Sequence, residues 1–241
     1  MSAWQIFVRQ FVELEGYKTV LKGLLNTVMI AVFGLIIGFV IGSIVAVVRA
    51  VPAYKNPIII FLQKLGWVYT TVFRGTPMFV QLLIIHFVLF PVMGISFNNI
   101  VITKDFAVSG VVIEAIIAFA LNSGAYISEI MRSGIGAVDK GQLEAGRALG
   151  LSYPRAMLSI VLPQAFKNVL PTLGNEFISL IKETSIAGFI TVMDVTRAFQ
   201  AIANSTYEFI VPYLMLAAVY LVLVILITLL VKLLERRLKN A

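Results

Sequence analysis

The chain contains no cysteine and only one histidine among its 241 residues. Disulfide bonds and thiolate metal sites are therefore excluded, and the redox compartment cannot be read from the sequence. Charged residues are also scarce, at 13% of the chain. A lone histidine and scattered carboxylates do not form a set with the spacing of a catalytic or metal centre. We therefore expect neither an enzymatic active site nor a metal site.

Hydrophobic residues make up 60% of the chain, and its mean hydropathy is +0.97. A soluble domain has no core large enough to bury so much apolar surface. The chain carries 19 basic and 12 acidic residues, a net charge of +7. Basic membrane proteins owe such an excess to cytoplasmic loops that face anionic lipid, so it does not indicate nucleic-acid binding. The composition predicts an integral membrane protein in contact with lipid.

Five apolar regions come close to the roughly 20 residues that a helix needs to cross a bilayer. They cover residues 24–48, 57–93, 111–130, 168–192 and 209–231. The second region is too long for one straight helix, and Pro77 in Arg74-Gly75-Thr76-Pro77 removes a backbone donor, so we interpret it as one broken segment. Pro171 and Gly174 interrupt the fourth region. The predicted fold is all-α, with five transmembrane helices.

Residues 1–22 carry five charges, too many for the apolar region of a signal peptide. We expect this segment to be extracytoplasmic, the membrane domain to span residues 23–236, and residues 237–241 to form a cytoplasmic tail. We expect no appended soluble domain. Residues 98–105 and 198–206 are predicted to be external loops.

Orientation follows from the distribution of lysine and arginine. With the N-terminus outside, 11 basic residues fall on the inner side, Lys55 among them, and five fall on the outer side. The bias predicts an external N-terminus and a cytoplasmic C-terminus. It also places residues 139–163 in the cytoplasm.

Gly34, Gly38 and Gly42 form a stripe of small residues on one face of the first predicted span. Small residues at this spacing allow close approach of two helices. The stripe therefore indicates either close packing within the chain or a dimer interface.

The loop of residues 139–163 interrupts the apolar sequence with an ordered pattern. Residues 141–149 predict a short helix that presents Leu143, Ala145, Ala148 and Leu149 on one side. Gly150 is placed to end this helix in a left-handed conformation, and Ser152 to cap the next helix, with Pro154 in its first turn. Leu162-Pro163 should bend that next helix. A short rigid helix can transmit a rigid-body movement, which a flexible loop cannot. The alternative interpretation of residues 139–163 is an ordinary amphipathic loop at the membrane surface.

The spacing Glu144-Ala145-Gly146-x3-Gly150-x9-Ile160-x-Leu162-Pro163 resembles the loop by which permease subunits of bacterial ABC importers dock onto their ATPases. The common form of this motif has alanine where Gly146 stands, and both residues are small. Further blocks resemble polar amino-acid permeases of the histidine, glutamine and arginine type, over residues 73–82, 122–135, 162–165, 170–171 and 174–185. The resemblance covers about residues 20–235.

The resemblance implies a type I ABC importer permease fold in a bacterial cytoplasmic membrane. Its implied partners are two ATP-binding subunits, a second permease subunit (a copy of this chain or a paralogue) and an external solute-binding protein. It implies that the ATPase-docking positions are Glu144, Ala145, Gly146 and Gly150. The chain has no Gly-x4-Gly-Lys-Ser/Thr phosphate loop, so it should bind no cofactor itself, and ATP and Mg²⁺ would be used by the partner ATPase.

Polar and ionisable residues inside membrane segments are costly and are therefore candidates for function. The fourth region carries a set that could hold the ammonium and the carboxylate of an amino acid, namely Glu176, Lys182, Glu183, Thr184 and Ser185. Asn122, Ser123 and Tyr126 of the third region could complete a cavity. The alternative is an ion network in which Lys182 braces the subunit through Glu183 or Glu176.

Other ionisable residues receive structural interpretations. Glu114 lies in the first turns of the third region, where a helix N-terminus favours a carboxylate. Glu129 and Arg132 are three residues apart and can steady their own helix. Arg74 is expected to brace the break in the second region, and His86 to be a hydrogen-bonded packing residue.

The sequence thus predicts the permease subunit of an ATP-driven amino-acid importer that works by alternating access. Two alternatives stay open. One is an ion-coupled secondary transporter or channel, which leaves the cytoplasmic motif without a purpose. The other is an ABC importer permease for a different small solute.

Overall fold

The computed structural model describes residues 2–51, 56–103 and 106–239. Nearly all of its regular structure is helical, and one pair of short strands is present. In chain order the elements are α1 (Ala3–Phe7), the π-helical η1 (Val8–Glu13), α2 (Gly16–Ala50), α3 (Pro57–Gly75), α4 (Met78–Ile84), the π-helical η2 (Ile85–Leu89), α5 (Phe90–Val92), β1 (Ile100–Thr103), β2 (Phe106–Val108), α6 (Gly110–Gly136), α7 (Lys140–Ala148), α8 (Tyr153–Ala156), the π-helical η3 (Met157–Val161), α9 (Leu162–Glu183), the 3₁₀-helical η4 (Thr184–Ile190), α10 (Val195–Thr206) and α11 (Ile210–Lys239).

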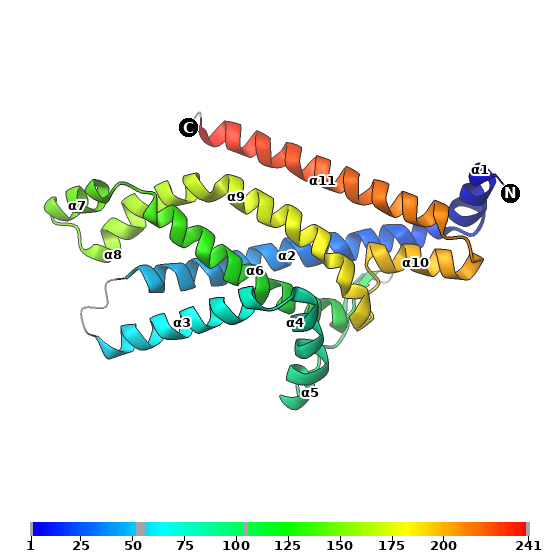
Figure 1. Cartoon of the computed structure of the whole chain (residues 1–241), viewed down its shortest axis with the longest axis horizontal. Coiled ribbons are helices and arrows are strands. Elements are labelled where there is room, and N and C mark those ends of the chain that lie inside the picture. Colours follow the sequence, from blue (N-terminus) through cyan, green and yellow to red (C-terminus); the bar gives the residue numbers. More distant parts are fainter. Residues whose placement is uncertain (1, 52–55, 104–105, 240–241) are drawn as a thin grey trace.

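The long helices α2, α3, α6, α9 and α11 run along the long axis of the molecule (Figure 1). The short helices α7 and α8 lie at one end, together with the start of α3 and the C-terminus. At the opposite end lie α1, α10 and the N-terminus. Termini at opposite ends are what an odd number of membrane crossings requires.

Among the residues that the structure describes, three helices, α2, α6 and α11, are long and apolar enough to cross a membrane. Two further crossings are bent pairs. Pro57–Gly75 and Met78–Val92 meet at 110°, and Tyr153–Ile190 and Val195–Thr206 meet at 53°. Counting each bent pair as one span gives the five predicted crossings, and the break at Gly75–Pro77 is confirmed.

The fourth predicted region is broken at a different place from the one expected. Pro171 lies inside α9, which continues without interruption from Leu162 to Glu183. The lack of a side chain at Gly174 allows α9 to pack closely against α11, because a Cβ atom there would collide with the side chain of Val231. The helix instead tightens into η4 and ends at Thr191, whose φ is +68°. The prediction that Pro171 and Gly174 interrupt this segment was therefore wrong.

Residues 198–206, predicted to be an external loop, belong to helix α10. Asp194 caps it by accepting hydrogen bonds from the backbone N–H groups of Thr196 (2.9 Å) and Arg197 (3.1 Å). Its buried side chains recur at helical spacing, at Val195, Ala198, Phe199, Ile202 and Ala203. This apolar period was the signal in the sequence that could have identified the helix.

The remaining predicted boundaries are shifted in smaller ways. Helix α2 begins at Gly16, so part of the predicted 1–22 extracytoplasmic segment belongs to the first long helix. The predicted external loop at 98–105 contains strand β1, which pairs antiparallel with β2. Lys55, residues 104–105 of that loop and residues 240–241 of the predicted tail lie outside the described residues.

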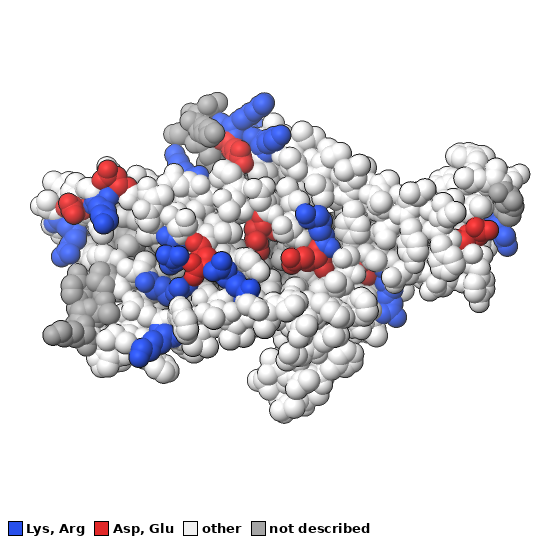
Figure 2. Space-filling model, viewed as in Figure 1, with Lys and Arg blue, Asp and Glu red and all other residues white. Residues whose placement is uncertain are grey.

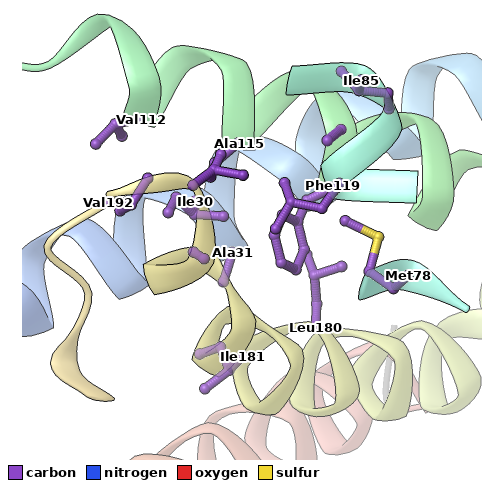
Figure 3. Packing of buried hydrophobic residues seen from close by; sticks show 14 of the residues in the cluster. Ile30, Ala31, Met78, Ile85, Val112, Ala115, Phe119, Leu180, Ile181 and Val192 are labelled. Carbon is purple, nitrogen blue, oxygen red and sulfur yellow. The ribbon is translucent and has the colours of Figure 1, made fainter. Parts of the chain in front are cut away.

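The main hydrophobic core forms where α2, α4, α6, α9 and η4 meet. Figure 3 shows Phe119 of α6 close to Leu180 of α9, with Met78 of α4 beside them. Phe119 is fully buried, and Ile30 and Ala31 of α2 close the cluster from another side. The core joins both bent segments to α2 and α6.

The glycine stripe of α2 packs within the chain, against α6. A Cβ atom at Gly42 would lie 2.6 Å from the carbonyl oxygen of Gly124 and 2.8 Å from the Cβ of Ile127. A Cβ atom at Gly38 would lie 3.0 Å from the backbone nitrogen of Gly124. The backbones of α2 and α6 are therefore in contact. Of the two interpretations of the glycine stripe, packing within the chain and a dimer interface, this contact supports packing within the chain.

We predict that Gly42→Leu lowers the free energy of unfolding by about 2–3 kcal/mol, because backbone atoms of α6 cannot move aside as a side chain can. Thermal unfolding of the detergent-solubilised protein measures this. Gly136→Leu is the matched control, since a Cβ atom at Gly136 meets nothing within 4 Å. Equal destabilisation by the two substitutions would contradict the packing argument.

Candidate functional site

Helix α7 is a short helix with defined signals at both ends. The carboxylate of Asp139 caps its start by accepting the Gly141 N–H at 2.6 Å. At its end, the N–H of Leu151 donates to the Gly146 carbonyl (3.1 Å) and that of Gly150 to the Arg147 carbonyl (3.0 Å). This is a Schellman motif, with Gly150 at φ +87° in the left-handed position. The predicted role of Gly150 as the helix-ending residue is confirmed.

The inner face of α7 is fixed to the following helices. Leu143 packs on a cluster that contains Val138, Met157 and Val161. Gly146 is buried, and a Cβ atom there would lie 2.6 Å from Cδ1 of Ile160. These contacts hold α7 against α8 and η3, so it is seated as a rigid piece.

The outer face of α7 is fully accessible. Leu149 is 86% exposed, and Glu144, Ala145, Arg147, Ala148 and Gly150 are exposed around it. Leu143 points inward, so the prediction that it shares a side with Ala145, Ala148 and Leu149 was wrong. Of the predicted docking positions, Glu144, Ala145 and Gly150 are accessible, whereas Gly146 lies underneath. Within residues 2–51, 56–103 and 106–239, no ion pair involves Glu144.

Asn122 belongs to a buried hydrogen-bond network under the α3–α4 break. Its Nδ2 donates to Oε1 of Gln81 at 2.8 Å. Nε2 of Gln81 in turn donates to the carbonyl oxygens of Phe73 (2.7 Å) and Thr76 (2.9 Å). The network satisfies carbonyl groups that the broken helix leaves free, which is why the 110° bend is tolerated.

Tyr126 and Glu129 of α6 meet three arginines. Arg132 binds Oε2 of Glu129 through Nε (2.9 Å) and Nη2 (2.8 Å), which confirms the predicted pair. Arg49 of α2 binds Oε1 of Glu129 and also donates to Thr70 Oγ1 at 3.2 Å. Nη1 of Arg74 lies 3.9 Å from Glu129 Oε1, and its guanidinium lies 5.7 Å from the Tyr126 ring centre. The contribution of Arg49 could not be read from the sequence, because it is 80 residues from Glu129.

Helix α9 divides the predicted pathway residues between two faces. Glu176 and Glu183 lie on a polar stripe with Asn168, Thr172, Asn175 and Ser179. This stripe adjoins α6, since Glu176 lies beside Ser123 and a shared groove contains Glu129, Ser133, Asn168 and Thr172. The sequence reasoning missed Asn168, Thr172, Asn175 and Ser179, although their spacing of three and four residues was visible.

Lys182 and Ser185 face a different groove, toward α10 and α11, lined also by Thr196, Tyr213 and Tyr220. Thr184 is buried and donates to the Ile181 carbonyl at 2.6 Å. Among the described residues, no ion pair joins Lys182 to Glu176 or Glu183. The structure therefore places Glu176 beside Ser123 of α6 with Glu183 near it, Tyr126 beside Arg74 of α3, and Lys182 and Ser185 in the groove toward α10 and α11.

His86 forms a hydrogen bond with Glu114 between η2 and α6. Both side chains are largely buried. The interpretation of His86 as a hydrogen-bonded packing residue is confirmed, and Glu114 is its partner.

Up to five membrane crossings among the described residues, two of them bent, and a short rigid helix at one end define a multi-span helical membrane protein. The family described as "Binding-protein-dependent transport system inner membrane component" matches residues 59–240, and the chain belongs to this family.

Individual relatives agree with this assignment. A putative glutamine transport system permease protein of Rickettsia prowazekii (strain Madrid E) is 39% identical over 218 residues, which are 90% of this chain and 92% of the relative. The arginine transport system permease protein ArtQ of Bacillus subtilis (strain 168) is 39% identical over 205 residues, covering 81% of this chain and 88% of that protein.

Two solved structures share the fold. A chain of a crystal structure of an amino acid ABC transporter with histidines aligns with a TM-score of 0.77 and 34% identity, over 94% of this chain and 98% of that chain. An inward-facing structure of the MetNI methionine ABC transporter aligns with a TM-score of 0.73 over 91% of this chain and 95% of that chain. Its 17% identity makes it evidence for the fold alone.

We predict that Gly150→Val loosens α7 while Gly150→Asn largely spares it. The left-handed conformation costs a β-branched residue about 1–2 kcal/mol, whereas asparagine tolerates it. Amide hydrogen exchange across α7 should therefore quicken roughly tenfold in the valine variant. Nothing lies within 4 Å of a Cβ atom at Gly150, so crowding does not complicate the comparison. Equal exchange in the two variants would contradict the conformational argument.

Proposed function

We propose that this chain is the transmembrane permease subunit of an ATP-driven amino-acid importer. Relatives named for glutamine and arginine transport, and a structural relative described as an amino acid transporter, support this substrate class. The observation that carries the proposal is α7, a rigid helix whose inner face is fixed to the bundle and whose outer face is open. Such a helix is suited to receive a push from a partner.

The end that carries α7 is proposed to be cytoplasmic. Figure 2 shows most lysine and arginine side chains of this view over the half that holds α7, α8 and the C-terminus. The described cations of these elements and their flanks are Arg132, Lys140, Arg147, Arg155, Lys167, Lys232, Arg236 and Arg237. The positive-inside rule then gives an external N-terminus and a cytoplasmic C-terminus in a bacterial cytoplasmic membrane.

The proposed assembly contains two permease subunits, two ATP-binding subunits and an external solute-binding protein. The second permease is either a copy of this chain or a paralogue. Because this sequence contains no phosphate-binding loop, ATP and Mg²⁺ act in the partner ATPases. This chain forms the pathway and hydrolyses nothing.

The contacts of α7 suggest how ATP would drive alternating access. Val138 at the α6–α7 junction and Leu143 of α7 pack on Met157 and Val161 of η3, which leads directly into α9. A displacement of α7 is therefore passed to the ends of α6 and α9 together. These helices carry Tyr126, Glu176 and Glu183, which we propose line the pathway.

We predict that Glu144→Lys abolishes most of the ATPase stimulation that the loaded solute-binding protein produces in the reconstituted complex. A lysine at this exposed position places the opposite charge where the ATPase groove would meet α7. Glu235→Lys is the matched control, with the same charge change near the C-terminal end of α11. Phosphate release in nanodiscs measures the effect, and size-exclusion chromatography checks that both variants are inserted and assembled.

Full stimulation of the assembled Glu144→Lys complex would reject α7 as the coupling element. Equal loss in the Glu235→Lys complex would show that charge on this side of the membrane matters generally, and would also reject it.

A further inference from the structure

Lys182 is an exposed cation in one of the bent membrane crossings. Among the residues that the structure describes, no ion pair involves it. Glu183, the next residue, belongs to the polar stripe of α9 on the side of α6. Asp194 is fully buried, and its oxygens accept the backbone N–H groups of Thr196 and Arg197. A cation in a membrane segment needs an anion or water beside it, and neither carboxylate forms an ion pair with Lys182.

The groove that contains Lys182 lies between the end of α9, η4, α10 and α11 and has a volume of about 410 Å³. Two of its hydroxyl groups, those of Thr196 and Tyr220, lie 3.0 Å apart. Its lining combines one ammonium group with four hydroxyl groups and an apolar floor, and it contains no carboxylate. The hydroxyl groups belong to Ser185, Thr196, Tyr213 and Tyr220, and the floor to Leu216 and Ala217. Such a lining fits an anionic group that is attached to an apolar one.

The depth of the groove places it near one boundary of the membrane. The N–H of Val195, at the start of α10, donates to Thr27 Oγ1 of α2 at 3.1 Å. A Cβ atom at Gly23 of α2 would lie 2.6 Å from the carbonyl oxygen of Asp194. The start of α10 is therefore level with the point where the charged residue Lys22 gives way to the apolar stretch of α2. At this depth a lysine side chain can extend to the lipid phosphates, and tyrosine is enriched.

The groove opens along α11, which the rest of the described chain barely covers. The apolar stretch of α11 is only 6% buried. At the mouth of the groove, Tyr213 is 41% exposed and Leu214 is 68% exposed. The proposed solute pathway lies on another side of α9, because Glu176 and Glu183 adjoin α6. A ligand therefore reaches Lys182 from the bilayer.

We propose that this groove binds an anionic phospholipid of the leaflet on the α10 side, the outer leaflet in the proposed orientation. The inference goes beyond the transport function and does not depend on the solute. The Lys182 ammonium pairs with a phosphate oxygen as a point charge, and the hydroxyl groups of Ser185 and Tyr213 donate to the same group. The start of an acyl chain lies against Leu216 and Ala217. Because no carboxylate lines the groove, phosphatidylglycerol is favoured over phosphatidylethanolamine, whose headgroup carries an ammonium.

The test measures which phospholipid lies at the groove in the permease–ATPase complex in nanodiscs. The chain contains no cysteine, so a fluorophore can be attached at Leu214→Cys when the ATPase subunit is also free of cysteine. Quenching by brominated phosphatidylglycerol is compared with quenching by brominated phosphatidylethanolamine in otherwise identical mixtures. Phosphatidylglycerol should be enriched about 3- to 10-fold at this site, the range expected for a charge-assisted bond in a partly exposed position. A fluorophore at Leu226→Cys, elsewhere on the exposed surface of α11, should report no enrichment.

The enrichment at Leu214→Cys should disappear in Lys182→Gln and persist in Lys182→Arg, which keeps the charge. Lys22→Gln is the matched control, because it removes an exposed lysine from the same boundary of the membrane but outside the groove. This variant should keep the enrichment. Size-exclusion chromatography reports whether each complex is assembled.

Four results would overturn the lipid site and leave the importer function standing. The first two are enrichment that persists in Lys182→Gln and enrichment that is lost equally in Lys22→Gln. The third is displacement of the lipid by inorganic phosphate in the buffer, which would assign the groove to a free anion. The fourth is separation of the permease subunits in Lys182→Gln, which would assign Lys182 to the contact with the second permease.

Discussion

The absence of water inside a bilayer is the constraint on which the rest of this structure depends. A broken membrane helix exposes backbone groups that only the protein can satisfy. At the α3–α4 break, Gln81 donates to the Phe73 and Thr76 carbonyls and is itself held by Asn122 of α6. At the second break, Asp194 caps α10, and Asn26 of α2 donates to the Met193 carbonyl at 2.9 Å. Each bend is thus fixed by a polar side chain of one of the straight helices, α6 or α2.

This arrangement makes α6 the helix that the glycine contact, the Glu129 cluster and α7 have in common. It touches α2 along the glycine stripe, carries Tyr126 and Glu129, and continues through Val138 into α7. Because α2 and α6 meet backbone to backbone, α6 has little freedom to deform alone. A push on α7 is therefore better transmitted as movement of a rigid body than absorbed by local bending. The charge cluster at Glu129 lies on the same helix, so a movement of α6 would carry this cluster with it.

The sequence predicts the features that depend on local chemistry. Proline at position 77 marks the first break, Gly150 marks the end of α7, and the apolar runs give five crossings. Features that depend on packing between distant segments were missed. Pro171 is accommodated within α9, and a side chain at position 174 would collide with Val231 of α11. Arg49 joins Glu129 across 80 residues, and Lys182 turns to the α10–α11 side. A single sequence carries no record of such contacts.

The central claim is that α7 binds the ATPase subunit and moves as a rigid body together with α9. Because the chain contains no cysteine, spin labels can be attached at introduced cysteines replacing Leu149 on α7, Phe166 on α9 and Leu234 on α11. Addition of the ATPase should immobilise the label at Leu149 and leave the one at Leu234 mobile. The distance between the labels at Leu149 and Phe166 should be the same with and without ATP. A label at Leu149 that stays mobile, or a Leu149–Phe166 distance that changes on ATP binding, would contradict the account.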